Sequence, residues 1–292
     1  MNEDLKGYFY IIFATTLLGS IGVLGKLIYQ YEPDPIKVVT YRAVIASVLL
    51  FVTIAFLDRK KLKIKTSDIP FFASYGFLSV TITFILFFYA IKYTTVAIAT
   101  ILIYTFPAWV LILSIFILNE KLDKNKIIAL ILTFLGCVLV IQVYDPAALK
   151  FNLKGIIYGL ICGLGAGSYT LFGKKATFNY DSQTIVTYAF GFGALFLLLF
   201  CPPNTLFEKS YPATAWLWIF TLAIVPTIFG YSLYTRGLKY LEAGKAGIVA
   251  TWEVVIASLL ALVIFGEKLT LWQILGALLI FLGIFVIKRM KS

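Results

Sequence analysis

The sequence predicts an all-α membrane protein with ten transmembrane helices in two inverted five-helix repeats, and three observations predict this fold class. Apolar residues make up 61% of the 292-residue chain and charged residues only 13%, and the mean hydropathy is +0.95. A soluble domain usually carries about 25% charged residues. The apolar residues fall into runs of helical length, and several motifs recur at a nearly constant spacing. The composition therefore excludes an ordinary soluble enzyme, a disordered chain and a coiled coil.

Ten apolar segments are long enough to cross a bilayer, which takes about 20 residues of helix. The predicted spans are 7–30, 36–57, 69–91, 95–118, 127–143, 155–173, 183–200, 214–235, 245–265 and 271–287. Strand-like alternation is absent, which argues against a transmembrane β-barrel. The first run is too long for a signal peptide and no small-residue cleavage site follows it, so we expect it to be retained as a span.

Small residues are frequent within the spans and allow helices to approach closely in a bilayer. Gly159 and Gly163 form a G-x-x-x-G pair, which has two interpretations, packing within the chain or dimerisation, and we favour the first. The three cysteines are far apart and the chain has no histidine. We therefore expect no metal site, cofactor or disulfide.

The basic residues predict the orientation of the chain. When loops are assigned alternately to the two sides, 16 of the 25 Lys and Arg residues fall on the side of both termini. The other side holds Lys92, Lys150, Lys154, Lys209 and Lys268. Cytoplasmic loops carry the excess of positive charge. We therefore expect both termini to be cytoplasmic, in the inner membrane of a prokaryote, and interpret the net charge of +11 as this bias rather than as a nucleic-acid surface.

The two halves of the chain repeat each other. Leu5-Lys6-Gly7 recurs at 153–155, Gly19-Ser20 at 167–168 and Gly25-Lys26 at 173–174, a spacing of 148. Lys92-Tyr93, Glu120-Lys121-Leu122 and Phe134-Leu135-Gly136 recur after 147 residues. We expect two repeats, 1–146 and 147–292. Because each repeat has five spans, an odd number, the second repeat must be inverted in the membrane. The basic residues agree, because they are concentrated in loops of the first repeat whose equivalents in the second have few. Inverted repeats are typical of secondary transporters, whose substrate site lies near the midplane.

These motifs resemble the EamA-type members of the drug/metabolite transporter superfamily over nearly the whole chain. The resemblance is carried by Gly25-Lys26, Arg42, Pro107 and the two Glu-Lys-Leu turns. The family often has a Glu-Pro pair in span 9, where this chain has Glu253 followed by Val254. The resemblance implies ten helices around a central cavity, with spans 5 and 10 at the periphery, and import or export of a small metabolite.

Glu253 is the only carboxylate within a predicted span. A charged residue at the centre of a transmembrane helix costs about 2.5–3.5 kcal/mol on insertion scales, and such residues usually face a cavity. Burial favours the protonated form of a carboxylate. We therefore predict that Glu253 binds substrate and couples transport to protons. The alternative is a structural ion pair with Arg42.

Aromatic residues make up 17% of the chain, and tyrosines in mid-span need a polar partner for their hydroxyl groups. Aromatic faces beside one carboxylate are typical of a cation site. The candidate substrate-binding residues are Glu253, Trp252, Tyr104, Tyr41, Arg42, Tyr169, Tyr188, Tyr231, Tyr234 and Ser168. Tyr41 and Tyr188 occupy equivalent positions in the two repeats, as expected if each repeat contributes one aromatic wall of the substrate site. The alternative for each tyrosine is packing or a place in the interfacial belt.

Pro107 and Pro226 interrupt spans 4 and 8 and are hinge candidates, although static kinks are equally common. The leading hypothesis is a proton-coupled secondary transporter of a choline-like or amino-bearing cation. The main alternative is an exporter of aromatic or neutral amino acids or of drugs, in which Arg42 would bind a carboxylate. A membrane-embedded enzyme would need a set of acid–base or metal-binding groups that this sequence does not offer. A channel would need a continuous polar ring, and the sequence shows none. The expected partners are a small-molecule substrate, protons and lipid, with the chain a monomer or weak homodimer.

Overall fold

Ten helices long and apolar enough to cross a membrane make up the described part of the chain, residues 3–142, 152–206 and 208–289 of a computed structural model. The described spans are Glu3–Ile28, Pro35–Leu57, Thr66–Tyr93, Val96–Leu118, Lys124–Ile141, Leu153–Ala176, Ser182–Phe200, Ala213–Tyr240, Ala243–Phe265 and Leu271–Lys288. All ten predicted spans are confirmed. Span 8 continues beyond its predicted end at residue 235, because its last turns contain the charged residues Arg236 and Lys239, which end the apolar run but not the helix.

Several spans consist of more than one helical segment. The first repeat contains α1 (Glu3–Leu18), α2 (Ser20–Ile28), α3 (Pro35–Leu57), η1 (Arg59–Leu62), η2 (Thr66–Asp68), α4 (Ile69–Tyr75), η3 (Gly76–Ile82), α5 (Thr83–Tyr93), α6 (Val96–Ile103), α7 (Phe106–Leu118) and α8 (Lys124–Ile141). The second contains α9 (Leu153–Ala176), α10 (Ser182–Phe200), α11 (Pro203–Leu206), α12 (Ala213–Leu222), η5 (Ala223–Gly230), α13 (Tyr231–Tyr240), α14 (Ala243–Ala250), α15 (Trp252–Phe265) and α16 (Leu271–Lys288). The expected boundary between residues 146 and 147 lies outside the described residues.

Side chains at the helix ends explain where several spans begin and stop. Asp34 accepts a hydrogen bond from the amide of Ile36 and is followed by Pro35, which suits the first turn of α3. Thr270 and Gln273 form a capping box at the start of α16. Asn119 after α7 and Gly266 after α15 have φ of 56° and 68°, a left-handed conformation that stops a helix. These two stops are 147 residues apart, as the sequence repeat requires.

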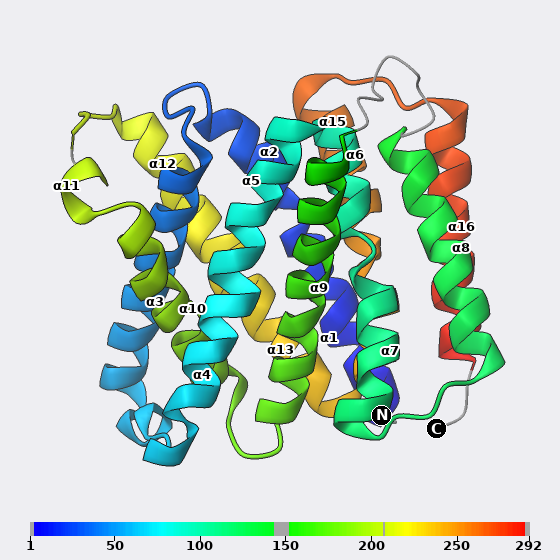
Figure 1. Ribbon diagram of the computed structural model, residues 1–292, viewed down its shortest axis with the longest axis horizontal. Coiled ribbons are helices and arrows are strands. Elements are labelled where there is room, and N and C mark those ends of the chain that lie inside the picture. The colour runs from blue at the N-terminus through cyan, green and yellow to red at the C-terminus, as the bar shows by residue number, and fades with distance from the viewer. Residues whose placement is uncertain (1–2, 143–151, 207, 290–292) are drawn as a thin grey trace.

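Helix contacts follow the two-fold relationship of the repeats. Span 2 packs on span 7, span 4 on span 9 and span 5 on span 10, so each of these pairs joins equivalent helices. Span 1 packs on span 8, and the equivalent pair, span 6 on span 3, also forms. Both ends of the described chain, at Glu3 and Arg289, lie on one side of the bundle (Figure 1). We call this the terminal side.

Helix irregularities also recur between the repeats. The π-helical segments η3 and η5 begin 147 residues apart, at Gly76 and Ala223, within spans 3 and 8. Span 4 is interrupted at Tyr104, the end of α6, and span 9 at Thr251, the end of α14, again 147 residues apart. Irregular backbone is tolerated in a membrane only inside the protein or beside a cavity. These positions therefore mark the interior of the bundle.

Repeated glycines lie where helices cross closely. A β-carbon on Gly19 would lie 3.0 Å from the carbonyl oxygen of Glu253, and one on Gly167 would lie 3.2 Å from that of Phe106. These crossings are equivalent, which explains the recurrence of Gly-Ser. The G-x-x-x-G pair packs within the chain, because a β-carbon on Gly159 would lie 2.5 Å from the Leu102 side chain and one on Gly163 would lie 2.4 Å from that of Thr105.

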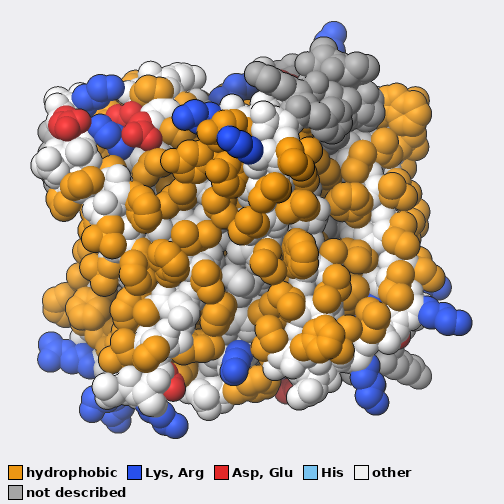
Figure 2. All heavy atoms as spheres, viewed as in Figure 1, with side chains coloured by type: hydrophobic (Ala, Val, Ile, Leu, Met, Phe, Trp, Pro, Cys, Tyr) orange, Lys and Arg blue, Asp and Glu red, His pale blue; other side chains and the backbone are white. Residues whose placement is uncertain are grey.

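Spans 5 and 10 lie side by side at the edge of the bundle, as the resemblance implied (Figure 1). Gly136 of α8 and Gly276 of α16 face each other, and a β-carbon on either would lie 2.6 Å from the carbonyl oxygen of the other. The outer surface is a broad hydrophobic band, with Lys and Arg concentrated at its two rims (Figure 2). This band is the surface that contacts lipid.

The inverted repeat predicts that equivalent loops lie on opposite sides of the membrane. Lys63, after span 2, and Lys209, after span 7, are both exposed. In single-cysteine variants, Lys63→Cys should react with a membrane-impermeant maleimide only from the inside of the cell, and Lys209→Cys only from the outside. Reaction of both positions from the same side would refute this topology.

Candidate functional site

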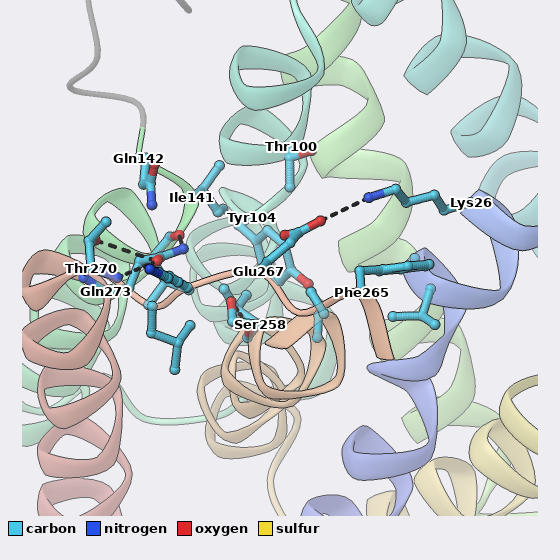
Figure 3. A pocket seen from close by; sticks show the side chains of 18 residues that line it. Lys26, Thr100, Tyr104, Ile141, Gln142, Ser258, Phe265, Glu267, Thr270 and Gln273 are labelled. Atoms are coloured by element: carbon cyan, nitrogen blue, oxygen red, sulfur yellow. Dashed lines mark hydrogen bonds and ion pairs between the residues drawn. The ribbon is translucent and has the colours of Figure 1, made fainter. Parts of the chain in front are cut away.

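A cavity of about 540 Å³ opens on the side opposite the termini and reaches the middle of the bundle. Its walls come from spans 1, 4, 5, 9 and 10. Tyr104 and Val254 line it at mid-span, and Lys26 and Glu267 lie at its mouth. In Figure 3 the Glu267 side chain extends toward Lys26, and their charged atoms are 2.8 Å apart. Water and a small solute can therefore enter between the repeats from this side.

The terminal side is closed by buried polar contacts. The Glu120 carboxylate accepts hydrogen bonds from the backbone amides of Ala243 and Gly244, at 2.5 and 3.0 Å. The Lys126 ammonium, 1% exposed, lies 2.8 Å from a Glu242 carboxylate oxygen and 4.0 Å from one of Glu120. These contacts tie span 4 to span 9 at the end away from the cavity mouth.

An aromatic cluster lies between spans 3, 6, 7 and 8. Tyr169 contacts Tyr231 with ring centroids 4.7 Å apart, and Tyr75 at 5.0 Å. Phe190 contacts Tyr231 at 5.0 Å. The Tyr234 hydroxyl shares a 2.8 Å hydrogen bond with Thr170. Of the predicted site residues, the structure thus brings Tyr169, Tyr231 and Tyr234 together.

Arg42 joins this aromatic cluster from span 2. Its side chain is 2% exposed, and its Nε donates a 2.6 Å hydrogen bond to the hydroxyl of Thr227 in η5. Its guanidinium carbon lies 5.2 Å from the ring centroid of Phe84 and 5.6 Å from that of Tyr231. Its Nη2 is buried and has no hydrogen-bond partner in the described structure. A buried donor without a partner is costly, which points to a group that binds there during function.

Glu253 lies near the middle of span 9, at the first turn of α15. Within the described spans it is the only carboxylate away from a span end. Its neighbour in sequence, Val254, lines the cavity, as does Tyr104 of span 4. Arg42 acts on it electrostatically, but no ion pair within 4.0 Å joins them in the described residues. The carboxylate therefore remains available to another partner.

The interrupted helices position Tyr104 and Trp252. Tyr104 ends α6, and Pro107 lies in the first turn of α7 just beyond the interruption. In span 9 the helix is interrupted at Thr251, although Val254 stands where the family often has proline, and Trp252 begins α15. Trp252 and Tyr104 both pack against the main hydrophobic core. The interruption in span 9 thus does not depend on proline.

The second hinge candidate, Pro226, lies inside η5. The equivalent π-helical segment η3 contains no proline, so proline alone does not create this geometry. A π-helix often marks a functional position in a membrane helix. Ser168 faces η3, and its hydroxyl lies 2.5 Å from that of Ser79. The contact between Ser79 and Ser168 connects η3 to span 6, and the hydrogen bond from Arg42 to Thr227 connects η5 to span 2. Both irregular segments are thus joined to helices beside the aromatic cluster.

The profile of the EamA-like transporter family matches residues 5–142 and 153–289. The chain belongs to this family. An uncharacterized transporter from Archaeoglobus fulgidus is 33% identical over 68% of this chain and 70% of its own. The uncharacterized inner membrane transporter YicL of Salmonella typhimurium is 26% identical over 98% and 96% of the two chains. A crystal structure that is 16% identical matches the fold with a TM-score of 0.82, over 98% of this chain and 99% of the other.

Two predicted site residues lie elsewhere in this EamA-like transporter. The Tyr41 hydroxyl donates to the backbone carbonyl of Leu206, and its ring packs on Tyr211 and Trp216 in a separate hydrophobic cluster. The Tyr188 hydroxyl donates to the carbonyl of Leu62 at 2.6 Å. Each tyrosine therefore ties its helix to a connecting segment of the other repeat. The two hydroxyl groups thus make equivalent contacts that join the repeats, and a role of these tyrosines in substrate binding stays a prediction.

Sequence reasoning missed several residues around the site. Tyr75 is a mid-span tyrosine and could have been chosen by the rule that selected Tyr104. Phe190 and Phe84 gave no signal, because apolar rings are common throughout the spans. Glu120 and Lys126 looked like ordinary loop charges, and only the fold shows that they meet the start of α14 in the second repeat.

The two fastening tyrosines of the EamA-like transporter should affect stability. We expect Tyr41→Phe and Tyr188→Phe each to lower the free energy of unfolding by about 0.5–1.5 kcal/mol, because each loses one hydrogen bond to a backbone carbonyl. Thermal unfolding of the purified protein measures this. Tyr158→Phe is the matched control, since no hydrogen bond of its hydroxyl occurs among the described contacts. Midpoints equal to the control would contradict the role.

Proposed function

We propose that this protein is a secondary transporter that moves a small organic solute across the inner membrane by alternating access. The observation that carries the proposal is a cavity between the repeats, open to one side and closed on the other by the contacts of Glu120 and Lys126. Family membership supports transport. The excess of basic residues on the terminal side supports cytoplasmic termini. Packing of Gly159 and Gly163 within the chain supports a monomer or weak homodimer.

Glu253 and the aromatic residues support a solute that carries an amino or quaternary ammonium group. A cation gains about 0.5–2 kcal/mol from each well-placed aromatic face, more when desolvated. Tyr104 lies in the cavity wall, and Tyr231 lies in the aromatic cluster beside Arg42. In this proposal the cationic group enters through the cavity, passes Tyr104 and binds beside the Glu253 carboxylate.

Arg42 favours an amino acid over a choline-like cation. Its guanidinium is buried beside Tyr231, and its Nη2 has no partner among the described residues. A bare cation would leave this donor unpaired and add a second positive charge. A zwitterion would place its carboxylate on Arg42 and its amine on Glu253. A choline-like cation remains the second candidate, because the aromatic rings and Glu253 alone are sufficient to hold it.

Exchange of substrate and proton at Glu253 would couple the two movements. Glu253 is partly buried, and a carboxylate that is shielded from water is stabilised by a nearby cation or by a proton. A cationic group and a proton therefore compete for one site, and each stroke carries one or the other. With no histidine in the chain and no other mid-span carboxylate in the described spans, Glu253 is the residue equipped for this exchange.

The coupling proposal predicts the behaviour of Glu253→Gln, which mimics the protonated acid. Uptake driven by an imposed pH gradient in proteoliposomes should fall to background, while the protein stays folded and monodisperse. Glu208→Gln, on an exposed loop where Glu208 pairs with Lys37, should transport like wild type. Full proton-driven uptake by Glu253→Gln would refute the coupling role.

The zwitterion proposal predicts a selective effect of Arg42→Gln. Amino acids should bind about 10–100-fold more weakly, because a hydrogen bond to a charged group is worth about 1.5–3 kcal/mol. Choline and other quaternary amines should bind at least as tightly as before. Arg42→Lys keeps the charge and should recover part of the loss. Titration calorimetry with both ligand classes measures this, and equal weakening of both would refute the assignment.

A further inference from the structure

The two sides of the bundle differ at one pair of equivalent residues, Glu120 and Glu267. Both follow a left-handed helix stop, Asn119 in the first repeat and Gly266 in the second. Both begin the Glu-Lys-Leu motif that recurs after 147 residues. An inverted repeat places these two turns on opposite sides of the membrane. Their side chains nevertheless make different contacts.

On the terminal side, Glu120 covers the N-terminus of α14. Its two carboxylate oxygens accept the amides of Ala243 and Gly244, the first residues of that helix. A carboxylate is favoured there because the first amides of a helix lack partners within it and carry partial positive charge. This contact joins spans 4 and 9 on this side.

On the opposite side, the residues equivalent to Ala243 and Gly244 are Val96 and Ala97, which begin α6. Among the described contacts, Glu267 bonds to neither of them. Its carboxylate instead lies 2.8 Å from the Lys26 ammonium, with both side chains more than half exposed. Glu267, Lys26 and Thr100 of α6 all line the cavity. The cavity mouth thus lies at the position that the Glu120 contact closes on the other side.

We infer that Glu120 and Glu267 are reciprocal latches of the transport cycle. When the terminal side opens, Glu120 releases α14, and Glu267 leaves Lys26 to accept the amides of Val96 and Ala97. In inverted-repeat transporters, exchanging the conformations of the two halves converts one open state into the other. The inference rests on the alternating access proposed above and assigns the residues that close each side. The Lys26 pair is solvent-exposed, so releasing it costs little.

The latches are unequal, which biases the cycle. Lys126 lies beside Glu120 and Glu242, but its equivalent is Gln273, and the equivalent of Glu242 is Thr95. The terminal-side latch therefore has ion pairs to a buried lysine, and the other side has neither that lysine nor the equivalent of Glu242. Contacts made in only one state shift the population toward that state. The state with the cavity open opposite the termini is the favoured one.

A cysteine in the cavity reports which side is open. Ala261 lines the cavity, and the native cysteines Cys137, Cys162 and Cys201 are buried. We label Ala261→Cys in the intact protein, reconstituted in liposomes, with an impermeant maleimide added from the cavity side. Ser210→Cys, at an exposed position on the same side, is labelled in parallel to correct for reagent access.

Glu120→Gln should slow labelling of Ala261→Cys at least about threefold, because the weakened terminal-side latch allows the cavity to close. Lys126→Gln should act in the same direction and is a second route should Glu120→Gln fold poorly. Adding Glu267→Gln to either variant should restore fast labelling, because the opposite latch can no longer form. Glu208→Gln, added to either variant as a matched control, should restore nothing.

Slow labelling that persists after Glu267→Gln is added would overturn the role of Glu267. Fast labelling in both Glu120→Gln and Lys126→Gln would overturn the role of the terminal-side latch. If Glu120→Gln and Lys126→Gln both label fast, but their labelling slows when the pH gradient is reversed, alternating access is supported and only the latch assignment fails. If no variant or gradient changes labelling, alternating access itself fails.

Discussion

Lipid cannot hydrogen-bond to a peptide group, and the arrangement of this protein follows from that constraint. Five of the described spans depart from a regular helix, at Gly19, in η3 and η5, at Tyr104 and at Thr251. At each of these positions the chain packs against other helices through buried or partly buried residues. The lipid-facing pair of spans 5 and 10, by contrast, is regular and joined by close glycine contacts. Regular helix thus lies where lipid is the neighbour, and irregular helix lies where protein and water satisfy the backbone.

The irregular positions also place the polar residues. Thr227 in η5 accepts the hydrogen bond of Arg42, and the interruption at Thr251 turns Glu253 into the first turn of α15. Arg42 and Glu253 form no ion pair within 4.0 Å among the described contacts, and the Nη2 of Arg42 is buried without a hydrogen-bond partner there. A paired salt bridge at this depth would be a finished structural contact. Two separated charges are instead what the proposed zwitterion site requires.

The sequence was sufficient to predict the spans, the inverted repeat and the peripheral pair, because lipid imposes span length and the motifs recur in register. It also selects Glu253 and Arg42 as candidates, since charges are rare in mid-span, and their role in binding stays a prediction. It was insufficient for the tyrosines, because the direction of a hydroxyl depends on which helix lies opposite. Tyr41 and Tyr188 were therefore assigned to the site although they bind connecting segments, and Tyr75 was overlooked. The contacts of Glu120 join residues more than 120 positions apart, which spacing alone does not reveal.

The pairing of spans 5 and 10 has a consequence for how such a chain arose. These two helices pack mainly on each other, and they are the same helix of the two repeats. One five-helix half could therefore have associated with an inverted copy of itself through this seam, as a dimer of separate chains inserted in both directions. Joining the halves removes the need for one gene product to insert both ways. It also frees each half to diverge, so that position 126 is a lysine while its equivalent, position 273, is a glutamine.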